Sequence, residues 1–192
     1  MIGGAGTKVP IPPIDPAQER WGLNNLTAGP GGSKAFEGCT RWFDVHHKEH
    51  IVTRRHANMW GAYQRFTIPV YLCERHADLP TSQAYPLAEV QEMFKGTRLF
   101  SSSLDYMLAA AMLWGFTEIE LYRFRMGNPS YRHQVSSGRW WLDQCFKRGV
   151  TVKHLSASRL AHDIKAHPPN PEAHHLMYGF ETTDRARLYR SR

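Results

Sequence analysis

The chain has 192 residues, of which 42% are hydrophobic, and a formal net charge of +7 at pH 7. A chain of this length can build one domain with its own core, so its stability does not depend on disulfides. Cys39, Cys73 and Cys145 are far apart and odd in number, so they indicate neither a disulfide framework nor a zinc knuckle. No stretch approaches the roughly 20 apolar residues of a membrane helix, and the first residues lack a signal-peptide pattern. We therefore expect a cytoplasmic protein without membrane contacts.

The excess of basic residues has two interpretations. It can serve solubility alone, or it can attract phosphate groups, either of a nucleotide or of nucleic acid. Four arginines, at positions 185, 187, 190 and 192, fall at the end of the chain. Because such an end is usually solvated, binding of nucleic acid is the less favoured partner prediction. Association into a homo-oligomer is compatible with the sequence.

The chain begins with a glycine-rich turn at Gly3, Gly4 and Gly6, and there is room for almost no strand before it. Glycines let backbone N–H groups approach a phosphate closely, although a flexible terminus explains the same composition. Three short strands are predicted after it, over residues 20–25, 40–45 and 68–72. In the third of them, Pro69 should lie near the start or at a sheet edge. Helices are predicted over residues 53–65 and 87–94, with a loop over 80–86 between them.

Residues 99–126 form the most regular unit of the chain. Ser101, Ser102 and Ser103 precede a helix predicted over residues 104–114, which is apolar or small on nearly every face and should therefore be buried. Gly115 should end this helix, since glycine readily adopts the left-handed conformation. Residues 118–124 then alternate polar and apolar side chains, which is the period of a strand. This order is half of a βαβ crossover and predicts an α/β sheet.

The last third of the chain shows a polar loop, a helix, a strand and a short helix, over residues 127–134, 138–148, 149–155 and 156–164. The adjacent Trp140 and Trp141 cannot share one helix face, so one is expected in the core and the other outside it. Together the elements predict a Rossmann-like, open, mostly parallel sheet with helices on both faces and a truncated first strand. We expect this nucleotide-binding domain to span residues 1–165, followed by a Pro/Arg-rich tail over residues 166–192.

Several polar residues fall where predicted strands end. Asn24 and Asn25 follow the first of the three short strands, and the segment from Asp44 to His50 follows the second. Open α/β sheets bind ligands at this edge. The serine-led helix would begin at the same edge, where its free N–H groups and its dipole attract an anion. Ser102 and Ser103 could bind a phosphate there, or they could only cap the helix.

The histidines after the second strand allow three interpretations. On a helix, His46 and His50 would be four residues apart and could bind a metal ion together with Asp44. A histidine at this edge could instead act as a general acid or base or contact a phosphate. A solvated loop is the third interpretation. We favour the acid–base role over metal binding and expect no metal.

A second polar patch follows the strand over residues 118–124. It consists of Tyr131, Arg132, His133 and Gln134, in the predicted polar loop. The patch could face a ligand, or it could be a solvated surface turn.

The order of these pieces resembles that of bacterial family-42 sialyltransferases and of a wider set of phage-encoded Rossmann-like proteins. The matching pieces are Gly4-Ala5-Gly6-Thr7, Gly22-Leu23-Asn24, Ser102-Ser103, Gly115-Phe116-Thr117-Glu118-Ile119 and residues 149–160. The phage set is the more similar of the two. It also shares the pieces Arg41-Trp42-Phe43-Asp44-Val45-His46, Tyr131 and Gln134. Together the pieces cover most of residues 3–160.

The resemblance implies a site and a reaction. In the sialyltransferases the glycine turn, the Asn and the Ser-containing loop hold a cytidine nucleotide sugar. By position, the resemblance assigns ligand binding to Gly4, Gly6, Asn24, Ser102, Ser103 and Tyr131. Asn25 is a further candidate because it ends the same predicted strand as Asn24, and Gln134 because it resembles the phage pattern together with Tyr131. His46 or His133 would be the acid or base of a glycosyl transfer. The ligand would be a nucleotide or nucleotide sugar, no further cofactor would be required, and a phage-encoded protein would lie in the host cytoplasm.

Two positions depart from the family scheme. Ala5 stands where the scheme has an Asn, and Arg125 stands where it has an acidic residue. These differences make nucleotide binding better supported than sugar transfer. The alternative function is therefore a non-catalytic phage accessory or scaffold protein, one that keeps the fold and contacts nucleic acid through its basic surface.

Overall fold

The structure is a computed structural model that describes residues 2–3, 13, 15–24, 37–53, 59–122, 124, 126, 134–154, 177 and 180. The strands of this part are β1 (Ile2–Gly3), β2 (Trp21–Leu23), β3 (Arg41–Phe43), β4 (Val70–Leu72), β5 (Ser82–Ala84), β6 (Glu118–Tyr122) and β7 (Thr151–His154). The helices are α2 (Lys48–Thr53), α3 (Met59–Tyr63), α4 (Leu87–Met93), α5 (Ser103–Leu113) and α6 (Val135–Lys147).

The strands form one seven-stranded sheet in the order β5-β4-β3-β2-β1-β6-β7. Every neighbouring pair is parallel. The predicted Rossmann-like α/β fold is thereby confirmed. The short strand β1 pairs with β2 on one side and β6 on the other, so the strand order changes direction there. The carboxyl ends of the strands near β1 form the edge at which such sheets bind ligands.

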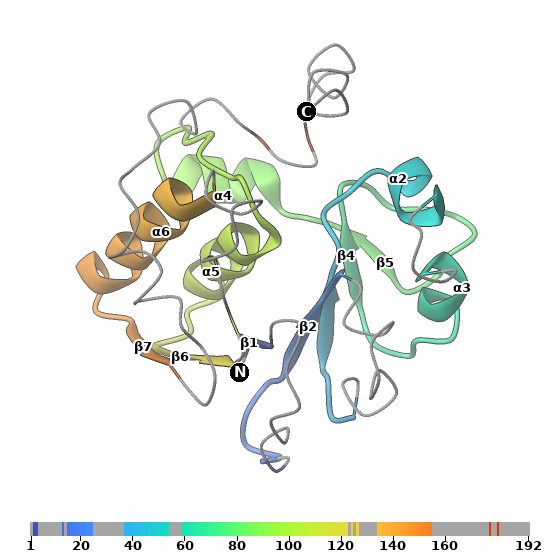
Figure 1. The fold of residues 1–192 in the computed structure, drawn as a ribbon, viewed down its shortest axis with the longest axis horizontal. Coiled ribbons are helices and arrows are strands. Elements are labelled where there is room, and N and C mark those ends of the chain that lie inside the picture. The colour runs from blue at the N-terminus through green and yellow to red at the C-terminus, as the bar shows by residue number, and fades with distance from the viewer. Residues whose placement is uncertain are drawn as a thin grey trace.

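Helices cover both faces of the sheet, as Figure 1 shows: α4, α5 and α6 lie on one side and α2 and α3 on the other. Successive residues of β3 point to opposite faces. Phe43 accordingly packs in the core under α5, and Trp42 packs with the α3 residues Met59 and Tyr63 in the second core. Burial on both faces explains why the inner strand β4 (Val70–Leu72) reads as a short apolar run rather than as an alternating one.

Helix α5 is the central helix of the larger core. Its residues from Ser103 to Met112 are all buried, as its lack of a polar face predicts. Ser102 and Asp105 form a capping box at its start, in which the Ser102 side chain accepts a hydrogen bond from the Asp105 backbone N–H. Gly115 follows the end of the helix with a φ of 78°, the left-handed conformation expected of it.

The segment after β4 differs from the prediction. Residues 80–86 were predicted to be a loop, but Ser82–Ala84 form β5, which pairs with β4. The polar sequence Ser-Gln-Ala carries no strand period, so the strand depends on tertiary contacts. The Ser82 hydroxyl accepts from the His76 N–H at 2.9 Å and donates to the His76 carbonyl, closing the connection from β4. Pro69 precedes β4, which lies inside the sheet rather than at its edge.

Helices α2 and α3 are short and are tied together through Asp78 in the β4–β5 connection. The Asp78 carboxylate accepts from Lys48 Nζ at 2.6 Å and from Trp60 Nε1 at 3.0 Å. The Lys48 ammonium also lies 4.7 Å from the centre of the Trp60 ring. Because a helix of five or six residues is unstable alone, such tertiary contacts hold it in place.

The helix predicted over residues 53–65 is confirmed only for α3 (Met59–Tyr63), because residues 64–65 form a turn and α2 begins earlier, at Lys48. The remaining predicted elements agree with the structure or lie outside its described residues. The helices and strands predicted over 87–94, 138–148 and 149–155 correspond to α4, α6 and β7. The helix predicted over residues 156–164 lies outside the described residues. From the predicted tail, Met177 pairs with Phe100 in an isolated bridge, and the Phe180 ring lies 5.9 Å from that of Tyr106. No helix in the described part of the chain has the length and apolar character needed to cross a membrane.

Replacing Gly22 with alanine is expected to destabilise the sheet. A Cβ atom at this position would overlap the six-membered ring of Trp42, which is fully buried. Overpacking of this kind costs about 1–3 kcal/mol. Urea unfolding of Gly22→Ala should therefore show a lower free energy of unfolding than the wild type and a lower one than Gly138→Ala in α6, where the added Cβ meets only the end of the Met126 side chain at 3.1 Å. Equal stability of the two variants would contradict the expected overlap.

Candidate functional site

The carboxyl ends of β2 and β3 bring together side chains that the sequence places twenty residues apart. Asn24 directly follows β2, and Asp44 directly follows β3. The two strands are parallel neighbours with Leu23 paired to Phe43, so both polar residues reach the same edge. Ser103, the first residue of α5, reaches this edge from the helix: its hydroxyl donates to Asn24 Oδ1 at 2.9 Å.

Asn24 adopts a left-handed backbone conformation with a φ of 45°. Asparagine tolerates this conformation better than most residues, because its short side chain can make local hydrogen bonds. The Asn24 carbonyl accepts from Trp42 Nε1 at 3.2 Å and from the Tyr63 hydroxyl at 3.1 Å. The predicted binding residue Asn24 is thus held through both its side chain and its backbone.

Asp44, His46 and Tyr63 form a buried polar cluster beside Asn24. Asp44 and Tyr63 have no exposed surface, and His46 is 5% exposed. Asp44 Oδ1 is hydrogen-bonded to His46 Nδ1, and Asp44 Oδ2 accepts from the Tyr63 hydroxyl at 2.5 Å. An imidazole oriented by a buried carboxylate is the arrangement that general acid–base catalysis uses. The predicted catalytic residue His46 has this arrangement.

The histidines do not form a metal site with the described residues around them. His50 lies in α2, and its ring stacks on that of His46 with the centroids 4.8 Å apart. Stacked rings do not direct their nitrogen atoms to one point. The described part of the chain contains no group of three or more His, Cys, Asp or Glu residues that could hold a metal ion.

The predicted serines are buried at the start of α5. Ser102 and Ser103 are 6% and 3% exposed. Ser102 is the N-cap residue, and the Asp105 side chain reaches back to the backbone that precedes the helix. Asp105 Oδ2 accepts from the backbone N–H groups of Ser101 and Ser102 at 2.8 and 2.9 Å. The contacts therefore show the capping role, and phosphate binding by these serines stays a prediction.

Asp105 joins the starts of α5 and α6. The Ser137 hydroxyl of α6 donates to Asp105 Oδ2 at 2.8 Å and is also bonded to the Ser101 hydroxyl. Burial raises the pKa of Asp105 from 3.8 to about 7, against the opposing effect of these hydrogen bonds. Asp105 Oδ1 is buried without a hydrogen-bond partner.

Gln134, a predicted binding residue, is the N-cap of α6. Its backbone carbonyl accepts a hydrogen bond from the Ser137 hydroxyl at 3.1 Å.

The other predicted site residues lie outside the described residues. These are Gly4, Gly6, Asn25, Tyr131 and His133. Gly4 follows the last residue of β1 in the sequence. For these five residues, ligand binding or catalysis stays a prediction.

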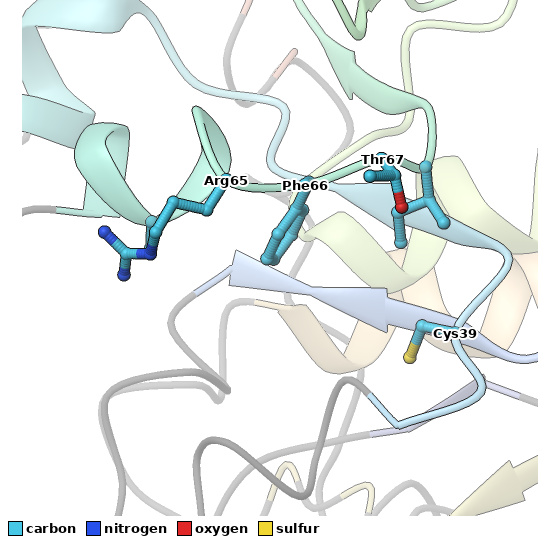
Figure 2. A pocket seen from close by; sticks show the side chains of 6 residues that line it. Cys39, Arg65, Phe66 and Thr67 are labelled. Carbon is cyan, nitrogen blue, oxygen red and sulfur yellow. The ribbon is translucent and has the colours of Figure 1, made fainter.

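A cavity of about 320 Å³ lies near the other edge of the sheet, and Figure 2 shows it. Its lining is mostly apolar and includes Cys39, Phe66 and Ile68, which precede β3 and β4. Arg65 extends away from Cys39 and Thr67 in Figure 2, so its charge does not converge with them on one point. Burial raises the pKa of the Cys39 thiol to about 11, which makes it a poor nucleophile. This cavity offers no chemistry comparable with that of the Asn24 edge.

Sequence reasoning missed Tyr63 and Asp105. Asp105 had a detectable signal, because Ser102 and Asp105 have the spacing of a capping box. Tyr63 had none: it is separated from Asp44 by 19 positions, and only the packing of α3 on β3 brings them together.

No protein-family model matches the chain, and neither a curated protein nor a solved structure is detectably similar to it.

Proposed function

We propose that the protein binds a nucleotide or a nucleotide sugar at the carboxyl edge of its sheet, and that His46 acts there in a glycosyl transfer. The observation that carries the proposal is the buried Asp44–His46 pair beside Asn24, at the ends of two neighbouring parallel strands. In open α/β sheets this is the edge at which ligands bind. The resemblance of the chain to the sialyltransferase scheme supports the choice of ligand.

The proposed reaction needs one proton acceptor. His46 Nε2 would take the proton of an acceptor hydroxyl while that oxygen forms a bond to the anomeric carbon of the sugar. The bond from this carbon to the phosphate oxygen would break at the same time, and the nucleotide would leave with the bonding electrons as a phosphate anion. Asp44 would stabilise the imidazolium that forms.

Ligand-induced thermal stabilisation tests the binding step. At a ligand concentration of about 100 Kd, binding stabilises the folded state by roughly 2.7 kcal/mol. For a chain of this size we expect the melting temperature to rise by about 5–10 °C with one class of nucleotide or nucleotide sugar, cytidine forms included. The shift should be lost in Asn24→Gly, which removes the side-chain amide but tolerates the positive φ. Gln83→Ala, which removes a side-chain amide from the edge strand β5, should keep the shift.

The outcomes separate binding from catalysis. If His46→Ala keeps the ligand-induced rise in melting temperature but loses sugar transfer, the result supports the enzyme. A shift without turnover in the wild type would leave a binding protein. If no nucleotide or nucleotide sugar shifts the melting temperature, the proposal is wrong.

The second candidate is a non-catalytic binding or scaffold protein with the same fold. It is favoured by the 5% exposure of His46 and by the Asp105 carboxylate, which bonds the backbone N–H groups of Ser101 and Ser102 directly before α5. If this protein contacts nucleic acid through its charge of +7, its affinity for DNA should fall steeply with salt concentration, which the nucleotide-binding enzyme would not show.

A further inference from the structure

Tyr63 connects the two halves of the candidate site. It is the last residue of α3, is fully buried, and packs in the core between α3 and β3. Its hydroxyl lies 2.5 Å from Asp44 Oδ2 and 3.1 Å from the Asn24 carbonyl. One hydroxyl carries one proton, so the shorter contact to the carboxylate is the principal hydrogen bond and the Asn24 carbonyl shares the donor weakly.

The two oxygens of Asp44 face different donors. Oδ2 accepts from Tyr63, while Oδ1 is bonded to His46 Nδ1. An ionised carboxylate has no proton to donate. The proton between Asp44 Oδ1 and His46 Nδ1 therefore belongs to Nδ1 of the imidazole. In the neutral ring, Nε2 then carries the lone pair. The carboxylate can hold this tautomer only while its plane is fixed, and the Tyr63 hydroxyl is a group that holds its other oxygen.

We infer that Tyr63 is a positioning residue that fixes Asp44 against His46 Nδ1, so that Nε2 of His46 is the basic nitrogen of the site. The role of Nε2 as the base that removes a proton from a hydroxyl substrate rests on the proposed function. The tautomer and its dependence on Tyr63 do not, because both are properties of the protein without ligand.

The contact to Asn24 gives the cluster a link to the binding position. The Asn24 backbone is left-handed. Its carbonyl accepts from Trp42 and Tyr63, while its side-chain Oδ1 accepts from Ser103. A ligand that moves the Asn24 carbonyl changes how the Tyr63 proton is shared. The position of the Asp44 carboxylate, and through it that of His46, is thereby coupled to the end of β2.

Nitrogen NMR of the histidine side chains tests the inference in the whole protein, since protonated and unprotonated ring nitrogens resonate far apart. The His46 signals are assigned by their loss in His46→Gln. In alkaline buffer the wild type should show His46 in the Nδ1–H form, with a strongly deshielded proton from the bond to Asp44. In Tyr63→Phe this proton signal should be lost, and the nitrogen signals should shift towards a mixture of the two tautomers.

Tyr85→Phe is the matched control. Tyr85 is also a buried tyrosine with a donating hydroxyl, but its partner is the Tyr106 carbonyl of α5, in the other core. The Tyr85→Phe substitution should lower the stability of the protein without shifting the NMR signals of His46. The inference is overturned if the wild type shows the Nε2–H form, or if folded Tyr63→Phe keeps the wild-type His46 signals. If Tyr63→Phe does not fold, the wild-type tautomer still decides the orientation of the base, and a thermal shift with nucleotide separately decides the proposed function.

Discussion

Replacing Trp141 with alanine should lower the free energy of unfolding by about 3–5 kcal/mol, the usual cost of removing a buried tryptophan. Trp141 is fully buried in α6, and its indole N–H donates to the Leu99 carbonyl at 2.6 Å. Its ring lies 4.9 Å from that of Phe100 and 4.8 Å from that of Phe94. The substitution would leave both a cavity and an unpaired carbonyl at the entry to α5, which increases the cost.

Trp140 is the matched control for this change. It is the preceding residue of the same helix and is only partly buried, with its ring 4.7 Å from that of Trp141. Trp140→Ala should cost roughly 1 kcal/mol. Thermal unfolding should therefore show a drop of about 6–20 °C in melting temperature for Trp141→Ala and a much smaller one for Trp140→Ala. Similar drops for both variants would contradict the assignment of Trp141 alone to the core.

The stability of the protein should fall as the pH rises from about 4 to 7, through the ionisation of Asp105. Burial raises the pKa of this carboxyl from 3.8 to about 7 in the folded state. Between these values the folded protein keeps a proton that the unfolded chain has released, so increasing pH favours unfolding. The effect is complete above pH 7 and is at most about 4 kcal/mol, since one pKa unit corresponds to about 1.4 kcal/mol.

Asp105→Asn isolates this effect, because the amide keeps an acceptor for Ser137 and for the N–H groups of Ser101 and Ser102 and does not ionise. Denaturant unfolding at a series of pH values should show the variant gaining stability relative to the wild type as the pH rises from 4 to 7. Asp143→Asn, the same replacement at an exposed position of α6, is the control for the change in charge. A stability difference between Asp105→Asn and the wild type that is constant or falls with pH would contradict the prediction.

The fold was predictable where local patterns agreed with tertiary packing. The buried helix α5, the turn at Gly115 and the alternating strand β6 each have a signature within ten or so residues, and together they indicate a parallel sheet. Strand β5 has no such signature, because its polar residues pair only as a consequence of the edge that β4 offers. Strand β5 forms because of its pairing partner elsewhere in the chain, and the strand propensity of its own residues does not predict such a pairing.

The candidate site was predictable only in part, for a related reason. Asn24 and His46 were found because each follows an apolar strand, and the ends of parallel strands converge. The partner that joins them, Tyr63, comes from a helix on the far side of β3, and no spacing in the sequence relates it to either. The three serines were predicted to lie at the start of a helix, but the sequence left open whether they bind a phosphate or only cap the helix. In the structure, the backbone N–H groups of Ser101 and Ser102 bind the carboxylate of Asp105 in the same helix.

The position of β1 between β2 and β6 also has a consequence for how the chain folds. Strands β2 to β5 pair with their sequence neighbours, and so do β6 and β7, whereas Gly3 must find Tyr122 across more than half of the chain. Pairings between distant residues are slow to form, because a long loop has to close first. The pairing of β1 with β2 is local by comparison, since Ile2 pairs with Trp21. We therefore expect β1 to form early with β2 to β5, β6 and β7 to pair separately, and the β1–β6 pairing to join the two halves last, so that the completed sheet is a late product of folding.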